Sequence, residues 1–372
     1  MKRYVLIAGE TSGDQYGGQL MKALKDIDPE SEFWGIGGEE MINAGLNQFE
    51  NIHNMSVVGF SEVLKKVPAM LKLANRLAQF IDEVNPDRVI LIDFPGFNLS
   101  LAKRIKYRSN ETKIDYFISP QIWAWNEKRV NIIKRYINHV IVIFPFETSF
   151  YKKHGIKAHY VGHPYLDLWK PSTTKYLRKK LKLKTSEKIV GIFPGSRTQE
   201  LKVHLPIYLK VAQSLSKHKN TRCVIGLAPG FNKLNINKQF NVGNIEIIDD
   251  EPLKLLECCD VALVTSGTIS LQATFMNTPC VVAYKLSRLS GFLSKLMMKV
   301  NFISMTNIIA NKIVIPEFIQ GEVNVKNLDF IISNLLNDEE YYKKIKFEMN
   351  SVKEKFVNKK NVINSAAKII NR

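Results

Sequence analysis

Asp93, at the end of a short apolar run, is the residue of this chain best placed to act as a base. The run 89–92 is typical of a buried β-strand, and the turn Phe94-Pro95-Gly96-Phe97-Asn98 follows Asp93. A carboxylate at the carboxyl end of a strand can take a proton from a substrate hydroxyl when its pKa and geometry suit. The same side chain could instead cap a helix or stabilise the turn. The local sequence leaves both roles open.

Two turns that contain Gly and Ser, each after an apolar run, could bind an anion. The first spans 8–14 with the sequence AGETSGD, and the second spans 193–197 with the sequence FPGSR. Backbone N–H groups at such turns, and at the N-terminus of a following helix, favour negative charge. Neither turn has the spacing of a dinucleotide fingerprint or the Gly-Lys-Ser/Thr ending of a Walker loop. Each could also be only a tight connection from strand to helix.

A third segment of this kind, Ser266-Gly267-Thr268, follows the apolar run 261–264 and opens a helical pattern. Its hydroxyls and amides could hold a diphosphate without a metal ion. Arg197 would add a planar, permanently charged fork that suits phosphate. An ordinary capped helix is the alternative for the segment. The acidic run Asp249-Asp250-Glu251 is interpreted as a surface turn, so we expect no metal and no cofactor.

Aromatic residues and one histidine lie near other predicted strand ends. Trp123 and Trp125 follow the run 116–118, where they could form a wall for a sugar ring or an acyl chain, or simply pack in the core. His163 stands between Gly162 and Pro164. A lone histidine is more often structural than functional, although its neighbours would fix where its ring points.

Short β-branched runs alternate with helical patterns along the whole chain. The expected strands are 4–7, 88–92, 116–118 and 140–143 in the first half, and 189–193, 223–227, 245–248, 261–264 and 281–283 in the second. Largely apolar strands separated by helices indicate parallel sheets covered on both faces. The predicted fold class is therefore α/β, doubly wound, and present twice.

The length of 372 residues favours two domains, since it exceeds what one hydrophobic core usually serves. We expect an N-terminal Rossmann-like domain at 1–168, a C-terminal one at 186–340, and a helical segment at 341–372 that packs back on either domain. Ligands of open α/β sheets bind beyond the carboxyl ends of the strands. We therefore expect a shared ligand site in an inter-domain cleft.

The composition narrows the partners and the compartment. The chain has 53 Lys and Arg against 35 Asp and Glu, a net charge of +18 that is spread along the sequence. This charge favours an anionic partner, but no RNA-binding, zinc-finger or basic-zipper signature is present, so nucleic acid is disfavoured. Four cysteines without metal-ligand spacing are typical of buried thiols in a reducing compartment. The start of the chain does not read as a signal peptide, and no run is long enough to span a bilayer, so we expect a cytoplasmic protein.

Taken together and in order, these segments resemble the lipid A disaccharide synthases, a family of GT-B-type glycosyltransferases. The resemblance runs from about residue 3 to 321 and rests on Ala8-Gly9-Glu10 with Ser12-Gly13-Asp14, Gly35-Ile36-Gly37-Gly38 with Met41, Met55-Ser56-Val57 with Gly59, Asp93 with Pro95 and Phe97-Asn98, Ser119-Pro120 with Trp123-Ala124-Trp125, Phe144-Pro145-Phe146-Glu147, Val161-Gly162-His163-Pro164, Pro194-Gly195-Ser196-Arg197 with Glu200, Ser266-Gly267-Thr268, and Pro316-Glu317 with Gln320.

The resemblance implies a reaction and a role for each candidate residue. UDP-2,3-diacylglucosamine would be joined to 2,3-diacylglucosamine 1-phosphate through a β-1,6 link, with inversion at the donor carbon and release of UDP. Asp93 would be the base for the acceptor hydroxyl. The acceptor side would be formed by Glu10, Ser12, Asp14 and Trp123. The donor side would be formed by Arg197, Ser266, Gly267, Thr268, Gln272 and Asn307.

Three departures from the family pattern qualify these roles. Gly96 stands where the family usually has a second Asp, which leaves Asp93 as the one carboxylate of its turn. Gln272 replaces a Glu that grips the ribose diol in related enzymes, and the segment 305–307 replaces a Leu-Pro-Asn pattern before Asn307. A UDP-sugar epimerase on the same fold, or a non-catalytic nucleotide-sensing or membrane-binding protein, remains the alternative.

Two amphipathic segments bear on membrane binding. The first has a helical stripe of apolar residues, with Arg288, Lys295 and Lys299 away from it: Leu286, Leu289, Leu293, Leu296, Val300 and Ile303. The second has a similar stripe, with Lys65, Lys66, Lys72 and Arg76 as its cations: Val63, Val67, Met70, Ala74, Leu77 and Ile81. Pro68 is expected to start or interrupt the helix of the second segment. Both stripes could face the core, or a subunit interface in a homo-oligomer. Lipid substrates and the positive charge favour peripheral attachment to the inner face of the cytoplasmic membrane.

Overall fold

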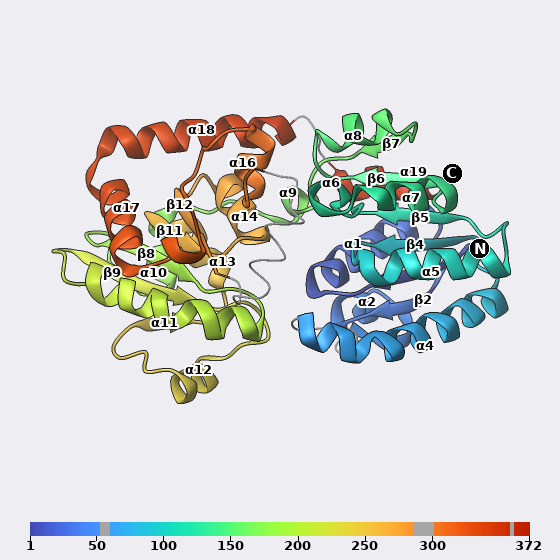
Figure 1. Ribbon diagram of the computed structural model, residues 1–372, viewed down its shortest axis with the longest axis horizontal. Helices are drawn as coiled ribbons and strands as arrows, with labels where there is room; N and C mark the ends of the chain where they lie inside the picture. Colours follow the sequence, from blue (N-terminus) through green and yellow to red (C-terminus); the bar gives the residue numbers. More distant parts are fainter. Residues whose placement is uncertain (53–59, 286–300, 358–360) are drawn as a thin grey trace. The chain divides into compact units, whose positions relative to one another are not determined.

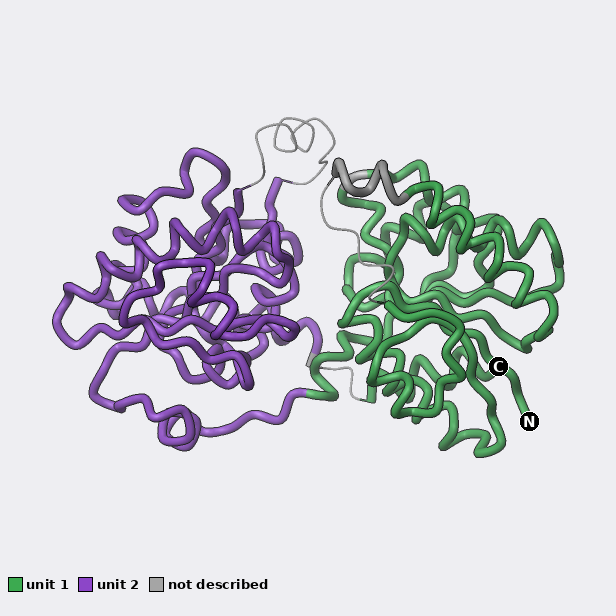
Figure 2. The backbone as a smooth tube through the Cα atoms, turned by 90° about the horizontal axis from the view of Figure 1, so that it is seen from below, with its two compact units in different colours: residues 1–168, 358–372 green, residues 169–357 purple. Residues whose placement is uncertain are grey.

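The computed structural model describes residues 1–52, 60–285, 301–357 and 361–372, and it divides into two compact units. Unit 1 comprises Met1–Leu168 together with Asn358–Arg372, and unit 2 comprises Trp169–Val357 (Figure 2). Each unit is built around one parallel sheet, as the alternating sequence pattern predicts.

Unit 1 contains a seven-stranded sheet in the order β3-β2-β1-β4-β5-β6-β7 (Figure 1). Its strands are β1 (Arg3–Ala8), β2 (Glu32–Gly37), β3 (Leu46–Asn51), β4 (Arg88–Ile92), β5 (Ile114–Phe117), β6 (His139–Val142) and β7 (Ala158–Tyr160). All of its strand pairs are parallel. The chain order reverses between β1 and β4, and this is where ligands of doubly wound folds bind.

The helices of unit 1 follow these strands and cover both faces of the sheet. They are α1 (Thr11–Ile27), α2 (Glu39–Asn43), α4 (Phe60–Val84), α5 (Pro95–Arg108), α6 (Ile122–Trp125), α7 (Val130–Tyr136), α8 (Glu147–Lys153), α9 (Tyr165–Leu168) and α19 (Val362–Ile370), with a short 3-10 helix η1 (Glu127–Arg129). Alternate strand residues such as Val5 and Leu91 share a core with α4 and α5. Ile92 points to the other face, where it lies against α1.

Unit 2 repeats this plan with a six-stranded sheet in the order β10-β9-β8-β11-β12-β13. Its strands are β8 (Lys188–Phe193), β9 (Thr221–Gly226), β10 (Glu246–Ile248), β11 (Val261–Val264), β12 (Cys280–Tyr284) and β13 (Glu317–Ile319). Its strand pairs are parallel as well. The reversal of order falls between β8 and β11, the equivalents of β1 and β4.

The helices of unit 2 surround this second sheet. They are α10 (Thr174–Lys180), α11 (Thr198–Leu215), α12 (Lys233–Gln239), α13 (Pro252–Cys258), α14 (Thr268–Met276), α16 (Met305–Ala310), α17 (Val325–Asn337) and α18 (Glu339–Val357), with a 3-10 helix η2 (Gln320–Glu322). The central strands β8, β11 and β12 are largely apolar and buried, as expected for parallel strands covered on both faces.

The C-terminal segment is shared between the two units. Helix α18 packs against α14, α16 and α17 of unit 2, whereas α19 packs against α1 of unit 1. The end of the chain is tied to β1, because Lys2 Nζ and Tyr4 Oη both donate to Asn371 Oδ1, at 2.9 and 3.0 Å. The segment 341–372 is therefore divided between the units: its part up to Val357 belongs to unit 2, and Asn358–Arg372 belongs to unit 1.

Helix α4 corrects two sequence-based expectations. It runs through Pro68, which neither starts nor interrupts it, and Pro68 is exposed. Of the predicted stripe on this helix, Ala74, Leu77 and Ile81 are buried in the core, while Val67 remains 40% exposed. The other stripe lies mostly at 286–300, outside the described residues.

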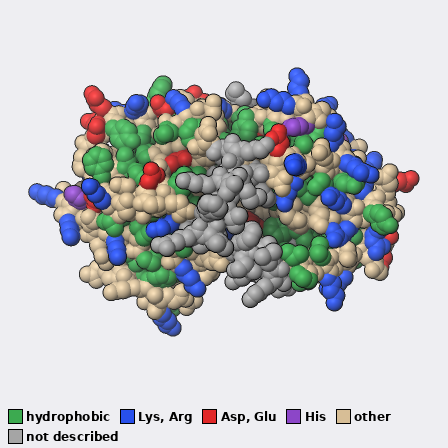
Figure 3. Space-filling view, in the orientation of Figure 1, with side chains coloured by type: hydrophobic (Ala, Val, Ile, Leu, Met, Phe, Trp, Pro, Cys, Tyr) green, Lys and Arg blue, Asp and Glu red, His purple; other side chains and the backbone are tan. Residues whose placement is uncertain are grey.

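No helix within the described ranges is long and apolar enough to cross a membrane. Lys and Arg side chains are scattered over both units on the face shown in Figure 3. All four cysteines are buried free thiols, as the sequence predicts.

Candidate active site

Asp93 lies at the point where the strand order of unit 1 reverses. It directly follows β4, and its neighbour Phe94 precedes α5. Both residues adopt left-handed backbone conformations, with φ values of 44° and 47°. Two consecutive non-glycine residues in this region are uncommon and cost free energy. The surrounding packing must therefore stabilise this strained turn. The turn places the half-buried Asp93 side chain at the carboxyl edge of the sheet.

Two side chains fix the backbone of Asp93. Its carbonyl accepts hydrogen bonds from Asn98 Nδ2 at 2.7 Å and from the Tyr116 hydroxyl at 2.6 Å. Asn98 also donates to the carbonyl of Ile92 at 3.2 Å, and its side chain is completely buried. Asn98 comes from α5 and Tyr116 from β5, so neighbouring elements on both sides determine the position of the candidate base.

The Asp14 side chain binds backbone groups of unit 1. Its two carboxylate oxygens accept from the backbone N–H groups of Gly38 at 2.7 Å, Met41 at 3.1 Å and Glu40 at 3.1 Å, at the start of α2. Only 4% of Asp14 is exposed. A carboxylate at a helix N-terminus satisfies amides that have no partner within the helix. Asp14 thus holds α2 against α1.

Glu10 and Ser12 lie near Asp14 at the start of α1: Glu10 directly precedes the helix, and Ser12 is in its first turn. Glu10 is exposed and Ser12 half-buried. Glu10 is the N-cap residue, but its side chain does not cap the helix. Both residues follow β1, which pairs with β4, and they are therefore at the same sheet edge as Asp93.

Trp123 is held by a carboxyl group, that of Glu147, which was not among the site residues predicted from the sequence. Its indole Nε1 donates to Glu147 Oε1 at 3.1 Å, and its ring meets that of Phe146 edge to face at 4.8 Å between centroids. Glu147 is fully buried, and burial raises its pKa to about 8 against the lowering effect of its N–H donors. The side chain of Trp125 lies outside the described part.

His163 is a buried structural residue of unit 1. Its Nδ1 accepts from the backbone N–H of Tyr165 at 3.2 Å, and its ring meets Tyr16 edge to face. Burial lowers its pKa to about 3, so the ring is neutral at physiological pH. This is the structural alternative that the sequence favours for a lone histidine.

In unit 2, the turn that carries Arg197 is organised by Glu200. The carboxylate accepts from the backbone N–H of Ser196 at 2.9 Å and lies 3.5 Å from Arg197 Nη1. Gly195 has a φ of 122°, and a Cβ atom there would come within 2.6 Å of Glu200. The Ser196 amide, which the sequence suggests for an anion, therefore already has an anionic partner within the unit. The Arg197 side chain is 53% exposed.

A second contact of α11 braces this turn against the end of β12. His204 Nε2 accepts from the backbone N–H of Lys285 at 2.9 Å, and its Nδ1 lies 2.8 Å from the carbonyl of Glu200. Burial lowers the pKa of His204. The neutral ring therefore carries its proton on Nδ1 and donates to Glu200.

The segment Ser266-Gly267-Thr268 follows β11, which pairs with β8. Gly267 has a φ of 147°, a conformation that suits glycine, and Thr268 is exposed at the start of α14. The Ser266 hydroxyl donates to the carbonyl of Ile303 at 2.7 Å. The turns of Arg197 and Thr268 therefore lie at neighbouring strand ends, where the strand order of unit 2 reverses.

The remaining donor-side candidates differ in their availability. Gln272 is half-buried one turn into α14. Asn307 is fully buried, and its amide is saturated: Nδ2 donates to the Ile315 carbonyl and Glu317 Oε1, and Oδ1 accepts from the amides of Val314 and Ile315. All four hydrogen-bonding positions of the Asn307 amide are used within unit 2.

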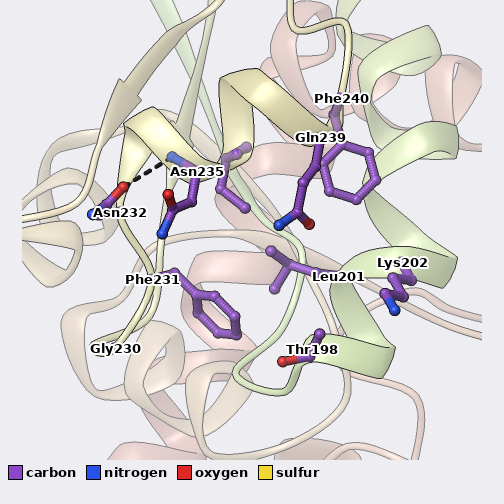
Figure 4. Close-up of a pocket in the computed structure, with 10 residues that line it drawn as sticks. Thr198, Leu201, Lys202, Gly230, Phe231, Asn232, Asn235, Gln239 and Phe240 are labelled. Atoms are coloured by element: carbon purple, nitrogen blue, oxygen red, sulfur yellow. Dashed lines mark hydrogen bonds between the residues drawn. The ribbon is translucent and has the colours of Figure 1, made fainter.

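A cavity of about 120 Å³ lies beside the first turn of α11 and was not anticipated from the sequence. Figure 4 shows Leu201 and Phe231 facing Gln239 and Phe240 across it. It is lined by Thr198, Leu201, Lys202, Gly230, Phe231, Asn232, Asn235, Ile236, Gln239 and Phe240. Asn232 caps α12 through a hydrogen bond to the N–H of Asn235 at 2.9 Å. The lining of the cavity is a mixture of apolar and amide side chains, which form no recognisable motif in the sequence.

The fold indicates the class of protein. Each unit has one parallel sheet, and its polar turns lie where the strand order reverses. Paired Rossmann-like units of this kind are the architecture of GT-B enzymes. A solved UDP-GlcNAc 2-epimerase from Neisseria meningitidis, bound to UDP-GlcNAc, superposes with a TM-score of 0.57 at 14% identity, covering 99% of this chain and 98% of that one. The chain therefore has the GT-B fold.

Sequence comparison identifies the family within that fold. The family model for lipid-A-disaccharide synthetase matches residues 4–370. A lipid-A-disaccharide synthase of Trichlorobacter lovleyi is 38% identical over 358 residues, covering 95% of this chain and 93% of the relative. Lipid-A-disaccharide synthase 1 of Legionella pneumophila is 34% identical, covering 95% and 92%. The chain belongs to the lipid-A-disaccharide synthase family of glycosyltransferases.

Proposed function

We propose that this enzyme joins UDP-2,3-diacylglucosamine to 2,3-diacylglucosamine 1-phosphate and inverts the configuration of the donor carbon. The acceptor oxygen forms a β-1,6 bond to C1 of the donor, and the bond between C1 and the diphosphate breaks, which releases UDP. The proposal is carried by the position of Asp93 at the reversal of strand order, in a chain of this family.

Asp93 is the proposed base for the acceptor 6-hydroxyl. It takes the proton as the acceptor oxygen attacks, so that no charged alkoxide has to form first. The strained turn and the two hydrogen bonds to its carbonyl keep the carboxylate in place during the reaction. Glu10, Ser12 and Trp123 are the proposed acceptor contacts at the same sheet edge.

Unit 2 is proposed to hold the donor. Arg197 and the amides that begin α14 at Gly267 and Thr268 would stabilise the negative charge that develops on the leaving diphosphate. Ser266 and Gln272 complete the proposed donor contacts. Since Asp14 accepts three backbone hydrogen bonds and the Asn307 amide is saturated within the protein, we infer that these two residues act by holding α2 and the segment 314–317 in place.

Peripheral attachment to an anionic membrane is also proposed, because both proposed substrates carry acyl chains. Val67 and Leu71 are exposed on α4 next to the exposed cations Lys72 and Arg76. Apolar and basic groups together favour binding to anionic lipid.

Mass spectrometry of the products from purified protein and the two acylated sugars tests the proposed reaction. A disaccharide 1-phosphate together with one equivalent of UDP is expected. The linkage and the anomeric configuration follow from NMR of the product. An epimerase would alter the UDP-sugar without an acceptor, and a nucleotide sensor would release nothing, so either result would contradict the proposal.

A further inference from the structure

Glu147 is a completely buried carboxyl group to which the proposed reaction assigns no step. It is the first residue of α8 and has no exposed surface. Its Oε2 accepts from the backbone N–H groups of Ile143 at 3.3 Å and Phe144 at 3.0 Å, while its Oε1 accepts from Trp123 Nε1 at 3.1 Å. Burying a carboxyl group is costly unless such partners offset the lost hydration. The arrangement therefore calls for an explanation.

The carboxyl group joins two loops that leave neighbouring strands. Ile143 and Phe144 follow β6, and Trp123 follows β5, which pairs with β6. A contact of 2.5 Å between Ser119 Oγ and Tyr151 Oη also links the loop after β5 to helix α8. The indole of Trp123 is therefore held by its hydrogen bond to Glu147 and by the edge-to-face contact with Phe146.

These loops are connected to the turn of the candidate base. Strand β5 lies between β4 and β6 in the sheet, and its Tyr116 donates to the carbonyl of Asp93. The charge of Asp93 is among the influences that raise the pKa of Glu147, after burial itself, so the two carboxyl groups lie within electrostatic reach of each other. Trp123 is thus held at the same sheet edge as Asp93.

We propose that Glu147 is a positioning residue that fixes the indole of Trp123 as a rigid wall for the sugar ring of the acceptor beside Asp93. This inference rests on the proposed function for the identity of the acceptor. A sugar ring presents apolar C–H faces that pack well on an aromatic ring, and such packing orients the ring only when the aromatic side chain itself is held.

The substitution Glu147→Gln tests this role with almost no change of shape. All three contacts described for the carboxyl group come from donors, and a glutamine places an NH₂ group where one acceptor oxygen stood. The amide oxygen can then serve either the backbone of 143–144 or the indole, but not both. We expect the indole to be released, because the backbone side offers two donors.

Kinetics and fluorescence should be measured on wild type, Glu147→Gln, Glu147→Ala, Trp123→Phe and the double variant Glu147→Gln/Trp123→Phe. We expect the acceptor KM of Glu147→Gln to rise about 10-fold, the usual cost of leaving a buried donor without its partner. The affinity for UDP should stay within about 2-fold, since no donor contact changes. The double variant should be no worse than Trp123→Phe alone.

The control is Glu127→Gln, which removes a half-exposed carboxylate of unit 1 that pairs with His154. It should behave like wild type. Unchanged acceptor KM in both Glu147 variants, or a loss of thermal stability with unchanged KM and kcat per folded molecule, would overturn the inference.

The fluorescence readout separates this inference from the proposed function. The emission of Trp123 is the difference between wild type and Trp123→Phe, and in the Glu147→Gln background it is the difference between that variant and the double variant. It should shift to longer wavelength in the Glu147→Gln background, because a released indole is more hydrated. If wild type makes no disaccharide, the proposed function fails, and the fluorescence still tests whether Glu147 holds Trp123. An unshifted emission would contradict the positioning role even in an active enzyme.

Discussion

The ring of Phe94 lies over the Cα atom of Gly9. A Cβ atom at Gly9 would come within 2.2 Å of Phe94 Cγ and 2.4 Å of Cδ1, closer than any real contact. Gly9 directly follows β1, and Phe94 is the residue after Asp93 in the turn after β4. The two turns at the reversal of strand order are thus packed against each other. The absence of a side chain at Gly9 determines where the candidate base lies.

Gly9→Ala is therefore expected to displace Phe94 and, with it, Asp93. Overpacking of this kind costs roughly 1–3 kcal/mol of stability. Misplacement of a catalytic group lowers turnover, and we expect a fall in kcat of at least about 10-fold. Urea unfolding and steady-state kinetics measure the two effects. Gly96→Ala is the matched control for stability, since a Cβ atom there meets nothing within 4 Å; equal stability of the two variants would refute the packing argument.

Asp93→Asn should leave the fold intact and lower kcat by about 10² to 10⁴, the usual contribution of a positioned general base. The hydrogen bonds from Asn98 and Tyr116 go to the Asp93 carbonyl and survive the substitution. Circular dichroism and turnover measured side by side check this. Asp82→Asn, which changes an exposed carboxylate of α4, is the control. Near-normal turnover in Asp93→Asn would transfer the role of base to Glu10.

The position of Asp93 could be predicted because the signal is local. The run 89–92 is continuous and apolar, so the strand and the residue after it are visible in the sequence. By contrast, β2 (Glu32–Gly37) and β3 (Leu46–Asn51) were not predicted, since the first contains two glycines and the second is largely polar. Strands β7 and β13 span only Ala158–Tyr160 and Glu317–Ile319, which is too short for a pattern.

Roles that depend on distant partners could not be predicted. The backbone amides that bind Asp14 lie at the start of α2, which begins 25 positions later, at Glu39, so nothing near Asp14 shows that its carboxylate already has partners. The burial of Glu147 likewise depends on Trp123, from a different loop. Such contacts exist only once the sheet has brought these loops together.

Arg197→Ala should weaken UDP binding by about 10- to 100-fold, because a hydrogen bond between charged groups is stronger than a neutral one. The Arg197 side chain is 53% exposed, so its removal should disturb the fold little. The carboxylate of Glu200 loses Arg197 but keeps the Ser196 amide as a hydrogen-bond partner. Isothermal calorimetry with UDP is the measurement, and Arg108→Ala, an exposed arginine of unit 1, is the control. Equal affinity of both variants for UDP would remove Arg197 from the donor site.

His163 is expected to make unit 1 less stable in acid. Its folded pKa is lowered to about 3 by burial, below the value near 6.5 of an unfolded histidine. Between these values the unfolded chain binds more protons, so the free energy of unfolding falls as the pH falls from about 6.5 toward 3. The loss between pH 7 and pH 4.5 should be roughly 2–3 kcal/mol from this residue. Urea unfolding of wild type and His163→Gln at both pH values tests this; equal losses in the two proteins would contradict it.

Attachment to anionic membranes can be assigned to one of two segments by charge reversal. On α4, Lys72 and Arg76 are exposed beside the exposed Val67 and Leu71, although the rest of that stripe is buried. The segment 286–303, which contains the other apolar stripe, carries Lys295 and Lys299. Each basic residue near such a surface contributes roughly 1 kcal/mol, so the reversal of two should release the protein at moderate salt.

Sedimentation with vesicles that contain anionic lipid, at low and high salt, compares Lys72→Glu/Arg76→Glu with Lys295→Glu/Lys299→Glu. The double variant Lys217→Glu/Lys219→Glu changes the net charge equally at two exposed positions after α11, and it should still bind. A general effect of net charge would release all three variants, whereas a defined membrane contact releases only one. If wild type itself stays in solution at low salt, membrane attachment through either segment is ruled out.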